Sequence, residues 1–85
     1  MKKLLGFVLI HPQKEDFVFR MHLDDGLEVV LYVPTPANAK IFTDIDEIEN
    51  CVLHLETFDF YVAKLFDNGD HYMVEFETTV SRASN

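Results

Sequence analysis

Cysteine is almost missing from this 85-residue chain, which contains only Cys51. A single thiol cannot form an internal disulfide or build a thiolate metal cluster by itself, so the sequence fits a reducing, cytoplasmic environment. Glycine is also scarce, and the three glycines are scattered at Gly6, Gly26 and Gly69. This spacing excludes a glycine-rich loop that binds phosphate.

Long apolar runs are absent as well, because no segment approaches the roughly 20 residues that a membrane-spanning helix requires. The opening residues, MKKLLGFVLIHP, have two lysines and then an apolar stretch, as a signal peptide does. No small-x-small cleavage site follows them. We therefore predict that this segment is the first β-strand, and we expect no membrane partner.

Positive charge is scarce in the second half of the chain. Residues 1–40 contain five cations and five acids, whereas residues 41–85 contain two cations and ten acids. The net charge is −8 and the pI is about 4.7. Because phosphate backbones and anionic lipids attract cationic surfaces, we expect no direct binding to nucleic acid.

The length and the 48% apolar composition predict one small domain over residues 1–80, with residues 81–85 as a frayed tail. Alternating apolar segments separated by turn residues predict a mostly β fold, all-β or α+β. We expect five antiparallel strands in a bent sheet or partly open small barrel, with one short helix within residues 34–50.

The first predicted hairpin spans residues 16–33 and turns near Gly26. A two-residue loop at Asp25 and Gly26 would pair Leu23 with Glu28 and mix polar with apolar side chains. A three-residue loop gives a wholly apolar face and is the register that we predict. Its pairs are Leu23 with Leu27, Met21 with Val29, Phe19 with Leu31, and Phe17 with Val33. The first strand extends this face if Leu9 lies beside Phe17, Phe7 beside Phe19 and Leu5 beside Met21.

A connection with two prolines, Pro34 and Pro36, then interrupts the sheet. Thr43 is a suitable helix N-cap, acids follow it in the first turn, and isoleucines recur at helical spacing. We predict a helix over residues 44–50. Its isoleucine stripe should lie across an open end or face of the sheet.

Residues 51–66 and 71–80 are predicted to form a second hairpin, because Asn68-Gly69 favours a two-residue type I′ turn. The resulting register defines an apolar core face. Its pairs are Leu65 with Tyr72, Ala63 with Val74, and Tyr61 with Phe76.

The opposite face of this hairpin carries a second apolar set with a charged border of Lys64, Glu75 and Glu77. This set is the candidate interface, and its members are Phe58, Phe60, Val62, Phe66 and Met73. Burying such side chains stabilises a protein by roughly 1.5–3 kcal/mol each, so something should cover them. A protein partner, a second copy of the chain, the 41–50 helix or a closing barrel could do so.

Candidate chemistry is sparse, and we predict no catalytic residue, no metal site and no cofactor. If residues 51–54 form a strand, Cys51 and His54 point to opposite faces and cannot make a thiol dyad. His22 facing Glu28 fits an ordinary cross-strand pair at a solvated turn better than a metal site. Asp59 falls on the core face beside Thr78 by strict alternation, yet such an aspartate more often marks a bend or bulge.

These features predict a non-enzymatic protein-interaction module that uses the second apolar face to bind either a protein partner or a second copy of itself. An alternative is an acidic inhibitor that imitates nucleic-acid charge against a basic DNA- or RNA-binding protein, since the acids gather in residues 41–85. A third is a small-ligand site in a half-open barrel. Its candidate lining residues are Tyr32, His54, Asp59, Tyr61 and Tyr72.

Overall fold

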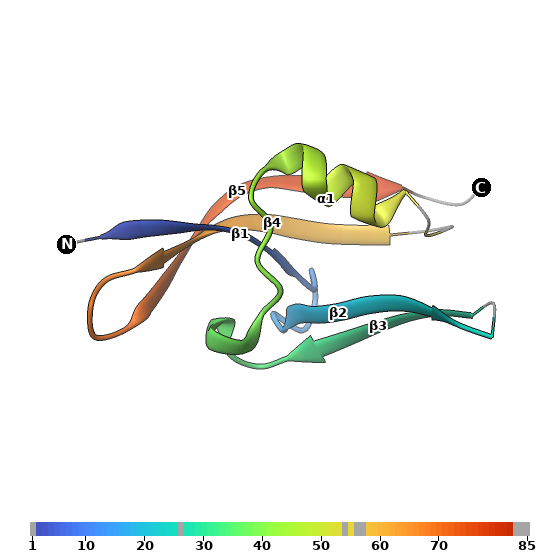
Figure 1. Ribbon diagram of the computed structural model, residues 1–85, viewed down its shortest axis with the longest axis horizontal. Coiled ribbons are helices and arrows are strands. Elements are labelled where there is room, and N and C mark those ends of the chain that lie inside the picture. Colours follow the sequence, from blue (N-terminus) through green and yellow to red (C-terminus); the bar gives the residue numbers. More distant parts are fainter. Residues whose placement is uncertain (1, 26, 54, 56–57, 83–85) are drawn as a thin grey trace.

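The computed structural model describes residues 2–25, 27–53, 55 and 58–82 of the chain. It contains β1 (Lys3–Ile10), β2 (Phe17–Asp24), β3 (Leu27–Val33), a 3₁₀ turn η1 (Pro36–Asn38), α1 (Ile45–Val52), β4 (Phe58–Asp67) and β5 (Tyr72–Arg82). The strands form one antiparallel sheet in the order β3-β2-β1-β4-β5. The predicted mostly β fold with five antiparallel strands and one short helix is therefore confirmed, as an open sheet (Figure 1).

The central strand β1 pairs along its length with β4, but among the described residues it pairs with β2 only at Ile10 and Phe17. The predicted pairing of Leu9 with Phe17 is wrong by one residue, which reverses the faces of the two strands relative to each other. Beyond that single pair the β2–β3 hairpin diverges from β1 and β4, so the sheet is bent (Figure 1).

The segment before α1 enters the gap between β1 and β2. The Lys40 amide donates to the carbonyl of Val18 at 2.9 Å, and Phe7 and Phe42 exchange two backbone hydrogen bonds of 2.8 Å. These bonds satisfy backbone groups that the divergence of the hairpin would otherwise leave unpaired. Residues 40–42 therefore connect the two parts of the sheet.

The chain crosses from one face of the sheet to the other at this point. Ala39 packs against one apolar cluster, whereas Phe42 belongs to the other. The first cluster, on what we call the open side, contains Val8, Phe17, Ala63 and Leu65. The second, on the helix side, contains Leu9, Val18, Phe42, Ile48, Val52, Leu55, Phe60 and Val62.

Gly6 permits this crossing. Its φ is +148°, and a Cβ atom there would lie 2.5 Å from the Phe42 carbonyl oxygen and 2.6 Å from Cγ2 of Ile41. No side chain fits such a space without moving the backbone of residues 40–42, which we call the crossing segment. The register of β1 against β4 also shifts between Leu4 and Gly6, as expected where glycine lies within a strand.

Helix α1 begins one residue later and ends two residues later than predicted. Asp44 is the N-cap in place of Thr43, and its Oδ1 accepts a hydrogen bond of 2.9 Å from the Glu47 amide. Ile48 and Val52 lie four residues apart and are both buried against the sheet. Their burial stabilises the last turn of the helix at residues 51 and 52, where a strand was predicted. β4 accordingly starts at Phe58, not at residue 51.

The first hairpin combines the two registers considered above. Phe17 pairs with Val33, as predicted, but the register shifts between Val18 and Arg20. Beyond this bulge Leu23 pairs with Glu28, which is the register of a two-residue loop. The predicted three-residue loop is therefore wrong, because a single extra residue in β2 reconciles an apolar pairing at one end with a tight turn at the other.

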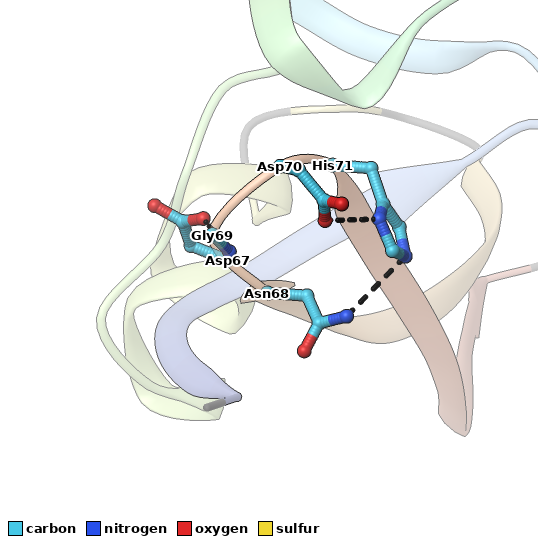
Figure 2. A network of polar contacts seen from close by, with 5 residues as sticks. All are labelled: Asp67, Asn68, Gly69, Asp70 and His71. Carbon is cyan, nitrogen blue, oxygen red and sulfur yellow. Dashed lines mark hydrogen bonds and ion pairs between the residues drawn. The ribbon is translucent and has the colours of Figure 1, made fainter.

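The second hairpin turns through four residues (Figure 2). Asp67 pairs with Tyr72, the Asn68 amide donates to the His71 carbonyl at 3.0 Å, and Oδ1 of Asp67 accepts from the Gly69 amide at 2.8 Å. The predicted two-residue type I′ turn is wrong, since Asn68 does not have the positive φ that it requires. An aspartate that accepts from the amide two residues later favours the wider loop.

Strand β5 continues to Arg82, so Ser81 and Arg82 are not part of a frayed tail, while residues 83–85 lie outside the described residues. Among the helices of the described residues, none combines the length and apolar character needed to cross a bilayer.

Candidate interaction surface

The five predicted interface residues lie on the helix side of the sheet. Phe60 is 4% and Val62 1% exposed, because α1 covers both. Phe58 is half-buried beside the same cluster. Phe66 and Met73 pair across the hairpin and are half-buried, and the Lys2 ammonium lies 4.3 Å from the centre of the Phe66 ring. The helix is therefore the cover that two of these five side chains require.

The opposite face of the same hairpin is exposed. We call four of its side chains the open-side patch, namely Tyr61, Tyr72, Val74 and Phe76, which are 39%, 45%, 40% and 66% exposed. Val74 pairs with Leu65 and Phe76 with Ala63, so the patch continues outward from the buried part of this face. The rings of Tyr61 and Phe76 pack edge to face with centres 5.8 Å apart.

This arrangement divides the predicted core face in two. Ala63 and Leu65 are buried, as predicted, but Tyr61, Tyr72, Val74 and Phe76 are exposed, so the prediction that they are core residues is wrong. The register shift between Val62 and Ala63 gives β5 one extra residue. The sequence signal that was missed is the number of helices, because one helix of eight residues can cover only one face of a five-stranded sheet.

Strand β5 is also an edge of the sheet and spans 11 residues without a proline. Its two acids each form a partly exposed ion pair within the chain. Glu75 Oε2 lies 2.6 Å from the Lys2 ammonium, and Glu77 Oε2 lies 3.1 Å from the Lys64 ammonium. The edge thus combines backbone groups that no second described strand pairs, large apolar side chains, and two acids that are each held in an ion pair.

Two clefts lie between the β2–β3 hairpin and the helix side. The larger, of about 410 Å³, is lined by Met21, His22, Lys40, Phe42, Glu47, Asn50, Cys51 and Leu55. The smaller, of about 340 Å³, shares Leu55 and includes His11, Tyr32, Phe58 and Asp59. Burial raises the pKa of the Tyr32 phenol, whose ring packs edge to face on His11 with centres 5.3 Å apart.

The residues that the sequence offers as candidates for catalysis or metal binding do not lie together in one site. Cys51 is on α1 with its Sγ 3.9 Å from Sδ of Met21, and its suggested partner His54 lies outside the described residues. His22 pairs with Val29 in place of the predicted Glu28. Asp59 is exposed and pairs with Ser81, so it does not lie beside Thr78, where strict alternation would place it. Within the described part of the chain, no three histidine, cysteine or acidic side chains form a metal-binding group.

The third predicted set, the small-ligand lining, is likewise dispersed. Tyr32 and Asp59 line the smaller cleft, whereas Tyr61 and Tyr72 belong to the open-side patch. No protein-family model matches the chain, and comparisons with curated proteins and with solved structures found no match. Fold and surface together define a small, open-sheet domain with one covered and one partly uncovered face.

Proposed function

We propose that this chain is a non-enzymatic interaction module that self-associates through β5. The observation that carries the proposal is the open-side patch, in which four large apolar side chains are 39–66% exposed on one hairpin. Complete burial of such side chains contributes roughly 1.5–3 kcal/mol each, so a partner that covers the patch gains substantial binding free energy. Aromatic side chains are also enriched at the centres of protein interfaces.

The backbone of β5 supports a strand as the partner. An exposed edge strand has unpaired amide and carbonyl groups, and many proteins protect such edges with prolines, with unpaired lysines or with very short strands. β5 contains no proline and no lysine and extends over 11 residues. A second β5 in antiparallel orientation has the same length and pairs these groups across a twofold axis.

Charge favours β5 as the place where two copies meet. Two chains of net charge −8 repel each other, so a stable contact forms where local charge is compensated. Lys2 and Lys64 compensate Glu75 and Glu77 on β5. The first turn of α1, by contrast, contains the acids Asp46 and Glu47, and the last turn of α1 has no basic residue to offset their charge.

The alternative of an acidic inhibitor receives less support from these contacts. Six of the described acids in residues 41–85 are engaged within the chain: Glu75 and Glu77 by lysines, Glu47 by Thr43, Asp44 and Asp67 by backbone amides, and Asp70 by His71. A surface that imitates a phosphate backbone requires acids free to meet the partner's cations. Self-association is therefore the function that we place first.

Sedimentation velocity over a range of protein concentrations tests the proposal. Val74→Asp should weaken dimerisation at least about tenfold, because it buries an unpaired carboxylate in the interface. Leu31→Asp is the matched control, since Leu31 lies on the other edge strand and is 41% exposed against 40% for Val74. We expect the control to dimerise as the wild type does.

The effect of salt on association is a second test, because the two proposed functions predict changes of opposite sign. Added salt should strengthen the association of two acidic copies, because it screens their mutual repulsion, whereas it weakens binding to a basic partner. A wild-type chain that remains monomeric at millimolar concentration in high salt contradicts the proposal. Equal dimerisation of the Val74→Asp and Leu31→Asp variants contradicts the location on β5.

A further inference from the structure

The larger cleft has the composition of a site for a small amphipathic molecule. Its apolar lining consists of the half-buried Met21 of β2 and Cys51 of α1, together with the buried Phe42 and Leu55. Its volume of about 410 Å³ falls within the range of roughly 300–1,000 Å³ typical of small-molecule pockets. Methionine and cysteine are polarisable and adaptable, so this lining can adjust to an apolar ligand.

On the rim of the cleft lies Lys40, which among the described lining residues is the one with a permanent positive charge. Lys40 is exposed, its backbone is fixed by the hydrogen bond to Val18, and its ammonium lies 5.4 Å from the centre of the Phe42 ring. The ion pairs found among the described residues do not involve Lys40. An anionic group of a ligand can therefore reach this ammonium while the ligand's apolar part lies against the half-buried Met21 and Cys51.

The carboxylate on the same rim is already engaged. Oε2 of Glu47 accepts a hydrogen bond of 2.9 Å from the Thr43 amide and another from the Thr43 hydroxyl. The hydroxyl is the largest cause of a lowered Glu47 pKa, and the charge of Lys40 is the smallest. Glu47 is thus oriented towards the start of the helix, which leaves Lys40 to interact with a ligand.

We infer that this cleft binds a small amphipathic carboxylate, with the apolar chain against the contacting pair Met21 and Cys51 and the carboxylate on Lys40. The site is separate from the open-side patch, because Cys51, Phe42 and Ile48 lie on the helix side and Phe76 on the other. Binding of the ligand and self-association through β5 can therefore be tested independently.

Cys51 supplies a probe for this site, since it is the single cysteine of the chain, lines the cleft and is half-buried. Decanoate, used below its micellar concentration, should slow the reaction of Cys51 with Ellman's reagent in a saturable manner. Decylammonium has the same apolar chain and the opposite charge, so it should protect Cys51 at least about tenfold less effectively.

Two rim variants give effects of opposite sign. Lys40→Met should raise the half-saturating concentration of decanoate about tenfold or more, because a hydrogen bond to a charged group is lost. Glu47→Gln should lower it, because a like charge is removed from the rim. Lys14→Met is the control for net charge, since Lys14 lies in the loop between β1 and β2 and does not line the cleft.

Absence of protection of Cys51 by decanoate overturns the inference, as does equal protection in wild type and Lys40→Met. Amide chemical shifts locate the ligand in the same samples. Perturbations at residues 21, 40–42 and 50–51 support the cleft, whereas perturbations confined to residues 72–76 place decanoate on the open-side patch and also overturn it. Dimerisation measured with and without decanoate keeps this result separate from the test of self-association.

Discussion

The two faces of the β4–β5 hairpin have similar apolar side chains and opposite environments. On the helix side Phe60 is 4% exposed, and on the open side Phe76 is 66% exposed. Their sequence contexts do not differ in a way that explains this contrast. The difference comes from residues 40–42, which carry the chain through the sheet and deliver α1 to one face only. Coverage of a strand is thus decided by a distant connection.

The largest expected loss of stability comes from a substitution at Gly6, where residues 40–42 pass through the sheet. Gly6→Ala should destabilise the fold by about 3–5 kcal/mol, because the new Cβ meets the Phe42 carbonyl and the residue must keep a glycine-like φ. Gly69→Ala is the matched control: its φ is +101°, but no atom lies within 4 Å of the new Cβ. It should cost only about 1–3 kcal/mol. Urea unfolding measures both, and equal losses would contradict the role given to the crossing segment.

The two faces should respond differently to the same truncation. Phe60→Ala leaves a cavity under α1 and should lower the free energy of unfolding by about 3–5 kcal/mol. Phe76→Ala removes an exposed ring and should change it by less than about 1 kcal/mol in the monomer. Thermal unfolding at low protein concentration makes the comparison. If both variants lose similar stability, the open side is covered within the monomer.

A smaller effect is expected at the start of α1, the element that makes the helix side different. Asp44→Ala should cost about 1 kcal/mol, because the Glu47 amide loses its acceptor. Asp44→Asn retains an acceptor and should recover most of this loss. Asp46→Ala removes a first-turn charge but no capping bond and should cost less. Chemical denaturation monitored by far-UV circular dichroism ranks the three variants.

The smallest effect concerns pH. The Thr43 hydroxyl, followed by the Thr43 amide, lowers the pKa of Glu47 from its ordinary value of 4.5. A group whose pKa is lower in the folded state stabilises the fold above its ordinary value, and this contribution disappears as the pH falls through the folded-state pKa. Thr43→Ala should raise the pKa of Glu47, whereas Thr43→Ser should not. Carboxyl-detected NMR titration checks this, and an unchanged pKa in Thr43→Ala would refute it.

Much of the architecture follows from local patterns in the sequence. Turn residues near Gly26 and Gly69, prolines after residue 33 and isoleucines at helical spacing locate four of the five strands and the helix to within a few residues, whereas β4 was predicted to begin at residue 51 and begins at Phe58. These signals depend on backbone preferences and alternation, which are properties of short segments. The largest boundary error, at residues 51–57, arose where a buried helical turn and a strand have the same apolar composition.

The faces could not be predicted from alternation alone. Each of the β1–β4, β2–β3 and β4–β5 pairs contains one register shift, near Gly6, after Val18 and after Val62 respectively. One shift exchanges the faces of every later residue relative to the partner strand, so an alternation counted from the turn fails beyond it. Gly6 gave a signal of irregularity in β1; Val18 and Val62 have ordinary strand neighbours and gave none.

The central place of β1 also has a consequence for how the chain acquires its structure. Lys3 pairs with Asp67 and Ile10 with Tyr61, so the first strand has to wait for residues near the opposite end of the chain. Proteins dominated by such distant pairings fold slowly compared with helical proteins of equal size. During synthesis the β2–β3 hairpin can form early, while the apolar first segment remains without its main neighbour until β4 has left the ribosome.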